Sequence, residues 1–505
     1  MDPGTVSRRQ TLRVAGVGAV AALAGCSGGD DDGTDNGDGN GTTTNQASAD
    51  AFTIGVLQDI TGANGPEFAH QGLAGLLSGF AYKNNRDSPL QLEDNPGSRI
   101  NWSENGYGTD PAVVMEELNG EVLRYTVEDI DGAGSVEIEL LIRDTASDAE
   151  TAASVATELI DQCDLLYGTS SSDGIVRVNN LVLDQTEIPM FVGQGSTSQV
   201  TADSAQCRDQ LFRTTENTAM VSRAGALSLV ENPDITKVAL LGVDSSFGRD
   251  VVSNYRQIFE NEGSTEYIER FEPVGLVTQG WQGILEDLLG SEGTHADTDA
   301  VVIGATGQTA TFYAEAFLQG EYEQTTFSQA PSRLTFREVG ESALDAVEAQ
   351  TGSREISKFV VDNLLPFGPI ACRYFWNQYD NEVNDWLTEN HKAAYGVVPD
   401  MFTGSAFATA SAIVQAFEAA GTADSAAILE EVPGMAVRDT PKGEEEYVFQ
   451  EYNNQARSPV TIAEYTPRTA EKWSAALQPS EPINRIEKTL TTIPEDDPRM
   501  TCDLS

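Results

Sequence analysis

The stretch Asp164-Leu-Leu-Tyr-Gly-Thr-Ser-Ser-Ser-Asp-Gly174 joins a short apolar run to a loop of hydroxyl side chains. The apolar half, Asp164–Tyr167, predicts a buried strand, and the residues from Gly174 to Leu183 predict a helix. Another apolar run, Ile188–Val192, predicts the next strand. A strand, a helix and a strand at this spacing form a unit of a parallel sheet, in which the helix covers one face.

The same alternation extends on both sides of this unit. Apolar runs predict strands and amphipathic runs predict helices, because the two patterns have different periods. The predicted strands are Phe52–Leu57, Ile138–Arg143, Lys237–Val243 and Ala300–Ile303, and the predicted helices are Gly72–Lys83, Asp148–Asp161, Met220–Val230, Phe247–Glu262 and Gln308–Leu318. The fold class is therefore α/β, with parallel sheets that are flanked by helices.

Two segments depart from this alternation. Residues 86–134 are acidic and rich in proline, with one predicted helix from Val113 to Leu123, and are interpreted as an insertion. Residues 474–505 also contain several prolines and have little periodicity. We expect this last segment to be a tail that packs on the surface.

The N-terminus carries the pattern of an exported lipoprotein. Ser7–Leu12 resembles a twin-arginine export motif, and the apolar run Val14–Gly25 is shorter than the roughly 20 residues of a membrane span. The run ends in Leu23-Ala-Gly-Cys26, which resembles a lipobox, in which Cys26 receives a diacylglyceryl group. The alternative is ordinary cleavage beside an incidental cysteine. We expect residues 1–25 to be a lipoprotein signal, and two acyl chains give stable anchoring.

Residues 26–51 are almost wholly small and polar, so we expect a disordered tether. From Phe52 onward the chain is long enough for two domains with large cores.

Acidic residues outnumber basic ones by 79 to 30, so the formal net charge is -49. This charge argues against nucleic acid as a partner, because phosphate contacts need positive charge. It also destabilises a compact chain by self-repulsion, unless molar salt shortens the Debye length to about 3 Å. Because the acidic residues are spread along the chain, the composition predicts a halophilic protein.

Four cysteines besides Cys26 permit two disulfides in an exported protein, with three possible connectivities. Proximity in the sequence favours Cys163 with Cys207, which leaves Cys372 with Cys502 by elimination. The long spacings between these cysteines argue against a zinc site.

Three loops that follow predicted strands are candidates for ligand contact, because ligands of open parallel sheets bind at the carboxyl ends of strands. The loop Gly168–Gly174 offers hydroxyls at a helix N-terminus, which suit an anion or simply cap the helix. The loop Gly193–Ser198 lacks the third glycine of a dinucleotide fingerprint and suits a small ligand, or is a tight turn. In Asp244–Arg249, Phe247 either stacks on a ligand or packs in the core.

The sequence offers little for catalysis or cofactors. It has no nucleophile elbow, and its three histidines, His70, His295 and His391, lie in unrelated contexts. An enzyme needs a base or an activated nucleophile, and no convincing set is present. We therefore expect a protein that is not an enzyme and needs no metal or cofactor.

The order of these features resembles the type I periplasmic binding proteins of the branched-chain amino acid and amide transport class. No single motif is specific, but their order along residues 52–473 is. The matching segments are Ile54–Leu57 with Thr61-Gly62, Arg143–Asp148, Gly168–Ser172, Ile188–Thr197, Leu211–Thr214, Val243–Gly248, Ala300–Gly307, Tyr395–Pro399 and Tyr447–Tyr465.

The resemblance implies two α/β lobes that are joined by three crossings and close on a small molecule. Lobe one is expected to comprise residues 52–217 and 329–439, and lobe two residues 218–328 and 440–473, with the tail at 474–505.

The resemblance also implies which residues hold the ligand. Hydroxyls and amides of lobe one would bind a carboxylate, and aromatic side chains would cover the ligand. The implied positions are Phe68, Ser171, Ser172, Gly195, Ser196, Thr197, Phe247, Thr278, Gln279 and Thr306. The acidic residue that would bind an ammonium group near Thr278 and Gln279 is missing. Either Glu67, Asp244 or Glu272 replaces it, or the ligand is an amide, a urea-like compound or a carboxylate.

By the same resemblance, the protein is a monomeric substrate-binding lipoprotein of an ABC importer. It would bind a small polar solute and deliver it to permease subunits at the outer face of the cell membrane. The alternatives are a ligand-binding subunit of a sensory receptor and an exported hydrolase.

Overall fold

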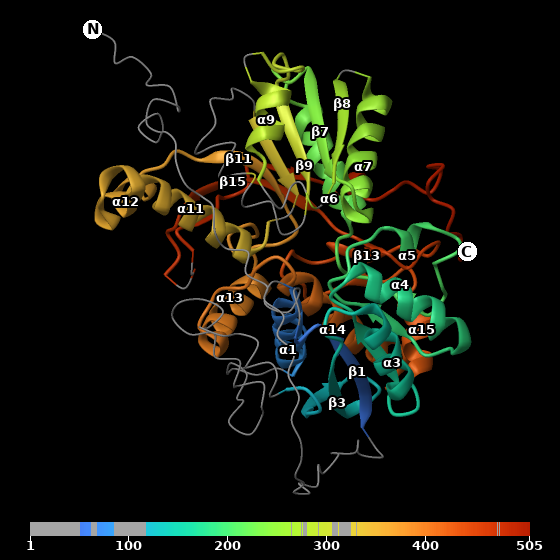
Figure 1. Ribbon diagram of the computed structural model, residues 1–505. Helices are drawn as coiled ribbons and strands as arrows, with labels where there is room; N and C mark the ends of the chain where they lie inside the picture. Colours follow the sequence, from blue (N-terminus) through green and yellow to red (C-terminus); the bar gives the residue numbers. More distant parts are fainter. Residues whose placement is uncertain are drawn as a thin grey trace, which may run out of the picture.

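The computed structural model describes residues 51–61, 68–84, 118–263, 265–273, 275, 280–290, 292–305, 312, 325–329, 331–471, 473 and 475–505. Within them the chain forms two α/β lobes that lie one above the other, with the N-terminal sheet in the lower lobe (Figure 1). No helix in these ranges is both long and apolar enough to cross a membrane.

The sheet of the first lobe contains, among the described residues, six strands. Their order is β2 (Val122–Ile130), β3 (Gly134–Asp144), β1 (Phe52–Gln58), β4 (Leu165–Gly168), β5 (Met190–Val192) and β6 (Leu211–Phe212). All neighbours are parallel except β2, which runs antiparallel to β3. Side chains of β1 alternate between the two faces, with Ile54 and Val56 in one core cluster and Leu57 in another. This sheet confirms the predicted α/β class.

The predicted insertion is in part regular structure. Residues 122–134 form β2 and its turn into β3, and the alternating burial along β2 is that of a strand with one solvated face. The predicted helix Val113–Leu123 is wrong at its C-terminal end, because Leu123 pairs with Leu140 of β3. Residues 113–117 lie outside the described residues.

Helices cover both faces of the first sheet. One face carries α1 (His70–Lys83), α14 (Thr403–Ala420), α13 (Glu382–Tyr395) and α15 (Ser425–Glu431), and the other carries α3 (Ala149–Leu159) and α4 (Ser172–Leu181). The helices α1 and α14 touch through Gly75 and Gly79, where a β-carbon would overlap Thr403, Ala406 or Ala410. These glycines let the two backbones approach closely.

The sheet of the second lobe follows the order β16 (Leu477–Pro479), β15 (Val460–Pro467), β11 (Phe367–Cys372), β10 (Thr325–Gln329), β9 (Ala300–Gly304), β7 (Lys237–Val243) and β8 (Glu266–Glu272), and β17 (Asn484–Ile486) also pairs with β15. The strands from β11 to β8 are parallel, whereas β15 is antiparallel to its neighbours. On one face lie α6 (Thr218–Val230) and α7 (Ser246–Glu262), and on the other α9 (Gln282–Leu289) and α11 (Arg333–Thr351), which continues into α12 (Arg354–Val361).

The boundaries between the lobes differ from those expected. Residues 333–372, which were assigned to lobe one, form α11, α12 and β11 of the second lobe. Residues 440–457, which were assigned to lobe two, contribute Tyr447 and Phe449 to the core of the first lobe. They belong to a small antiparallel sheet of β12 (Ala436–Val437), β13 (Tyr447–Phe449) and β14 (Ala456–Arg457). The sequence pattern identifies a strand but not the sheet that it joins.

Three crossings connect the lobes, and Glu216 of the first crossing contacts the other two. Its backbone oxygen accepts a hydrogen bond from Arg373 Nε (2.9 Å), which follows β11 in the second crossing. Its carboxylate Oε1 accepts from Ser458 Oγ (2.7 Å) in the third crossing and from Lys442 Nζ (2.6 Å). Both side chains of the Glu216–Lys442 ion pair are fully buried. The hinge is therefore held by one buried charged pair.

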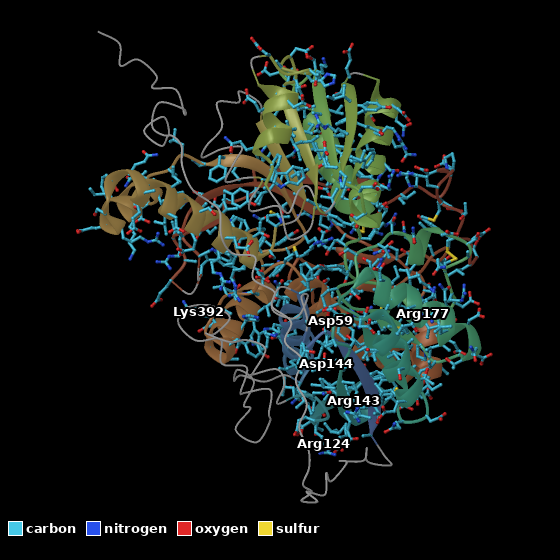
Figure 2. All side chains as sticks on the ribbon, in the orientation of Figure 1. Asp59, Arg124, Arg143, Asp144, Arg177 and Lys392 are labelled. Atoms are coloured by element: carbon cyan, nitrogen blue, oxygen red, sulfur yellow. A yellow bond between two sulfur atoms is a disulfide. The ribbon has the colours of Figure 1, made fainter. Side chains whose placement is uncertain are left out.

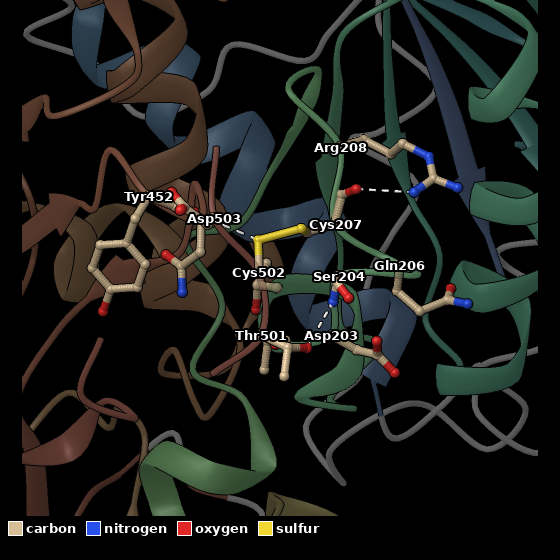
Figure 3. The surroundings of a disulfide bond; sticks show 12 residues. Asp203, Ser204, Gln206, Cys207, Arg208, Tyr452, Thr501, Cys502 and Asp503 are labelled. Atoms are coloured by element: carbon tan, nitrogen blue, oxygen red, sulfur yellow. Dashed lines mark hydrogen bonds between the residues drawn. A yellow bond between two sulfur atoms is a disulfide. The ribbon is translucent and has the colours of Figure 1, made fainter. Parts of the chain in front are cut away.

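The C-terminal tail returns to the first lobe, and the predicted disulfides are wrong. Cys502 bonds Cys207, 295 residues away, with the Cα atoms 5.9 Å apart (Figure 3). Cys163 and Cys372 are free thiols: Cys163 packs beside Gly55 and donates to the Leu159 carbonyl, while Cys372 is buried in the second sheet. Proximity in the sequence misled the assignment, because Cys207 lies where Thr501 and Cys502 contact the end of α5 (Gln199–Ala202).

Candidate ligand site between the lobes

The two hydroxyl-rich loops of the first lobe lie side by side, as the rule for parallel sheets predicts. Ser172 Oγ, in the first turn of α4, accepts hydrogen bonds from the backbone N–H groups of Ser196 (3.2 Å) and Thr197 (3.1 Å). Gly195 is needed here because a β-carbon would lie 2.9 Å from the Ser171 carbonyl oxygen. The structure therefore brings Ser172, Gly195, Ser196 and Thr197 together.

Ser171 has the structural role that the sequence left open. Its Oγ accepts a hydrogen bond from Gly174 N (3.1 Å), so it is the N-cap of α4. The neighbouring Ser170 is buried, and its Oγ lies 2.9 Å from Gln58 Oε1 at the end of β1 and 3.0 Å from Gln194 Oε1. This buried network fixes the first loop against the ends of β1 and β5.

The turn after β1 is also fixed from a neighbouring strand. Thr61 donates from its backbone N to Asp144 Oδ1 (3.0 Å) and from Oγ1 to Asp144 Oδ2 (2.5 Å). Asp59 accepts from the hydroxyl of Thr145. Figure 2 labels Asp59 and Asp144, which follow β1 and end β3 respectively. Both carboxylates therefore hold loops.

The loop Gly195–Ser198 contacts both lobes. Ser196 O accepts from Thr218 N (2.8 Å) at the start of α6, and Ser196 Oγ accepts from Arg373 Nη2 (3.1 Å) in the second crossing. Ser198 Oγ lies 3.3 Å from both carboxylate oxygens of Asp250 on α7. A change in the distance between the lobes would therefore alter the hydrogen bonds of this loop.

Two aromatic rings of the first lobe lie beside this junction. Phe68, half-buried just before α1, meets Phe402 edge-on with 5.4 Å between ring centroids. Phe402 precedes α14, and its ring carries the guanidinium of Arg373 at 5.0 Å from the centroid. Phe247 is half-buried and packs against the core of the second lobe. Phe68 also packs against a core cluster, so the structure gives both side chains packing contacts and places Phe68 one ring away from Arg373.

Other predicted residues fall elsewhere. Thr278, Gln279, Thr306 and the lipidation residue Cys26 lie outside the described residues, as does Glu67. Of the acids proposed as ammonium partners, Asp244 is exposed and bonded to Arg249, 2.9 Å from its Nε, and Glu272 pairs with Arg270. An arginine therefore already neutralises each of these two acids.

Two buried arginines that sequence reasoning missed converge on the Ser196 loop. Arg213 donates from Nη1 to Thr197 O (2.5 Å) and from Nε to Gln455 Oε1 (2.6 Å). Burial lowers the pKa of Arg213 to about 9 and that of Arg373 to about 10, so both stay protonated at neutral pH. A charged residue directly after an apolar strand, as at Phe212-Arg213 and Cys372-Arg373, was the available signal.

A surface hollow of about 490 Å³ lies elsewhere on the first lobe. It is lined by Asp129, Asp131, Gln415, Glu418, Ala419 and Arg438. Of these residues, Gln415, Glu418 and Ala419 lie near the C-terminal end of α14, whereas Phe402 lies at its N-terminal end. The hollow is therefore separate from the junction of the lobes. Within the described ranges, no group of three or more His, Cys, Asp or Glu residues could hold a metal ion.

Two buried histidines predict a pH-dependent stability. Burial, with the nearby charge of Arg333, lowers the pKa of His70 to about 3, and burial is also the main reason that the pKa of His391 falls to about 3. The unfolded chain binds these protons near pH 6.5 and the folded chain does not, so stability is lost as the pH falls below about 6.5. Each histidine contributes about 1.4 kcal/mol per pH unit between about pH 4 and 6.

Denaturant unfolding of the His391→Gln variant over this range tests the effect. We expect its unfolding free energy to depend on pH less steeply than that of the unmodified protein. His295→Gln, which changes a partly exposed histidine before β9, is the matched control at a position that is not buried. Equal slopes for all three proteins would contradict the prediction.

Comparisons with known proteins agree with this architecture. A search of curated protein sequences returns no significant match. Among solved structures, an ABC-type branched-chain amino acid transporter from Rhodopseudomonas palustris is 18% identical and superposes with a TM-score of 0.62, over 88% of this chain and 99% of that chain. A solute-binding protein from R. palustris in complex with 3,4-dihydroxybenzoic acid is 16% identical, with a TM-score of 0.60 over 87% and 98% of the two chains. A leucine-binding protein from Thermotoga maritima is 15% identical, with a TM-score of 0.59 over 86% and 99%.

The family comparison covers the same part of the chain as the two lobes. Residues 51–471 match a family model described as "Periplasmic binding protein". The match begins one residue before β1 and ends after β15, so it includes the first sheet, the three crossings and the second sheet except β16 and β17. The chain belongs to the periplasmic binding protein family.

Proposed function

We propose that this protein is the extracytoplasmic substrate-binding lipoprotein of an ABC importer, and that it carries a small polar solute between its two lobes. The observation that carries the proposal is the position of the Gly195–Ser198 loop. This loop is bound to Ser172 in its own lobe and contacts Arg373 in the second crossing and Asp250 in the second lobe. A solute that touched this loop would contact both sides of the hinge.

The mechanism follows from the hinge. The solute enters an open cleft and then contacts both lobes. Because the closed form binds the solute more tightly than the open form does, the solute stabilises the closed form by the difference between the two binding free energies. The closed form then presents both lobes together to the permease subunits. The buried Glu216–Lys442 pair keeps the three crossings aligned while the lobes move.

The N-terminal pattern supports the location that we propose. The lipid on Cys26 and the tether of residues 26–51 would keep both lobes near the membrane, within reach of a permease. The charge of -49 supports a working environment of molar salt. Cell fractionation tests the anchor: the intact protein should be found with membranes, and Cys26→Ser should be released. Equal membrane retention of both would disprove lipidation at Cys26.

The range of possible solutes is set by the site and by its structural neighbours. Branched-chain amino acids, amides, urea-like compounds and carboxylates all remain candidates, and the names of similar structures include a leucine-binding protein and a complex with a dihydroxybenzoic acid. At 15% and 16% identity these neighbours support the fold and only suggest the chemistry of the solute.

A solute panel in molar salt tests the function. Leucine, valine, acetamide, urea, acetate and benzoate are added one at a time, and the melting temperature and radius of gyration are measured. We expect at least one solute to raise the melting temperature by mass action, with saturation at high concentration, and to make the protein more compact. If no member of these classes stabilises or compacts the protein, the proposed function is wrong.

A further inference from the structure

We propose that the solute is a small organic carboxylate with an apolar body, and that Arg373 binds its carboxylate group. This inference rests on the proposed function and names the class of ligand for the same site.

Arg373 stands at the junction of the two lobes. It directly follows β11, at the start of the second crossing, and its side chain is almost wholly buried. Its Nε donates to the Glu216 backbone oxygen (2.9 Å) in the first crossing, and its Nη2 donates to Ser196 Oγ (3.1 Å) in the loop of the first lobe. These two hydrogen bonds fix the plane of the guanidinium beside the hydroxyl cluster.

Not all N–H donors of the Arg373 guanidinium have a strong hydrogen-bond acceptor among the described residues. Arginine has five N–H groups, and beyond the two hydrogen bonds above, the remaining hydrogen bond of Arg373 to a described residue joins Nη1 to Met401 Sδ at 3.6 Å. A thioether sulfur is a weak acceptor. The two Nη atoms of a guanidinium match the two oxygens of a carboxylate, which makes such pairs strong and specific. Met401 is flexible enough to give way to an incoming group.

The described acidic residues near Arg373 do not balance the positive charges around it. Glu216 is its nearest acidic neighbour, but the Glu216 carboxylate already binds Lys442 and Ser458. Near the same loop, Arg213 has neutral hydrogen-bond partners and its opposing charge is Asp250. Three cations therefore face two acids, which leaves one positive charge in a chain whose net charge is -49. An anion bound here would compensate a buried charge that is otherwise costly.

The side chains around Arg373 also indicate the chemical character of the rest of the ligand, beyond its carboxylate group. The guanidinium lies over Phe402, and Phe402 meets the half-buried ring of Phe68. Phe402 is buried, but Phe68 keeps part of its apolar surface exposed, which suits a planar or branched hydrocarbon group. Because Asp244 and Glu272 are each paired with an arginine, neither is available for an ammonium group. Judged by the residues that the structure describes, which do not include Glu67, the site favours an anion over a zwitterion.

Matched pairs of acid and amide test the inference. Benzoate with benzamide, and 4-methylpentanoate with 4-methylpentanamide, are titrated by calorimetry into the mature chain in molar salt. We expect the better acid to bind at least tenfold more tightly than its amide. Arg373→Gln should weaken binding of that acid by about 30-fold or more and should affect its amide much less, so the preference for the acid disappears.

Two further variants separate binding from folding. Arg249→Gln removes one positive charge from the surface of the second lobe, where Arg249 pairs with Asp244, and should keep the acid-to-amide ratio. Arg373→Lys retains the charge without the planar pair of donors and should show an intermediate ratio. A merely structural role for Arg373 would weaken acid and amide equally.

The outcomes distinguish the two proposals. If an amide or leucine binds as tightly as the acids, or if the preference for the acid survives Arg373→Gln, the inference is wrong and the binding function stands. If none of the four probes binds while a neutral or zwitterionic member of the wider panel does, the inference is again wrong. If nothing in either set binds, both proposals fall together.

Discussion

Replacing Lys442 with methionine is expected to lower the free energy of unfolding by about 3–5 kcal/mol, because it leaves the Glu216 carboxylate charged and buried without a cation. Lys442 Nζ is fully enclosed, and its three donors go to Glu216 Oε1 (2.6 Å), Pro459 O (2.7 Å) and Ser458 Oγ (3.1 Å). The rings of Tyr447 and Tyr379 also lie within 5.2 and 5.7 Å of this ammonium group.

A matched substitution on the surface gives the control. Lys237 pairs with Asp297 at 2.5 Å, but the aspartate side chain is 70% exposed, so Lys237→Met should change stability by less than about 1 kcal/mol. Urea unfolding in molar salt measures the stability of both variants. The double variant Lys442→Met with Glu216→Gln should recover part of the lost unfolding free energy, since it removes the unpaired carboxylate of Glu216. Equal effects of Lys442→Met and Lys237→Met would refute the role given to this pair.

Gly75→Leu is expected to destabilise the protein by about 3 kcal/mol or more, although leucine favours helices over glycine. At Gly75 a β-carbon would already overlap the backbone of Thr403 and lie 2.9 Å from the Ala406 side chain. A larger side chain can be accommodated only if α1 and α14 separate. That movement would also displace Phe68 and Phe402, which lie just before these helices.

Gly283, in the first turn of α9, provides the opposite case. Nothing lies within 4 Å of the position that its β-carbon would take. Gly283→Leu should therefore leave stability unchanged or raise it by a few tenths of a kcal/mol, up to about 0.8, from helix propensity. Thermal unfolding of both variants checks the contrast, and a stable Gly75→Leu protein would show that the seam between the helices is not tightly packed.

Many elements of both lobes could be predicted from the sequence because their signals are local. The strand Phe52–Gln58 and the helix Ser246–Glu262 closely follow their apolar patterns, since each pattern repeats with the period of the element that it forms. Val122–Ile130 was missed, because its exposed outer face and the proline-rich residues before it look like an irregular insertion. The alternation of burial along this strand is visible once β3 provides a partner.

The candidate site could be predicted only in part. Loops that follow strands were identified correctly, and Ser172 does bind the backbone of Ser196 and Thr197. Arg373 was not identified, because a charged residue directly after an apolar strand is a weak signal by itself. Its importance comes from the crossing that brings it to Ser196, 177 residues away.

The apolar periodicity of the sequence determined the α/β alternation, because it depends on neighbours within one turn or one strand and needs no distant partner. The two lobes were implied by the resemblance of the ordered segments to a known family. Tertiary structure alone decided which sheet receives β11, that Cys207 bonds Cys502, and that Glu216 pairs with Lys442 across 226 residues. Such pairings are set by the path of the chain through the crossings, where residues far apart in sequence meet in a shared low-dielectric interior.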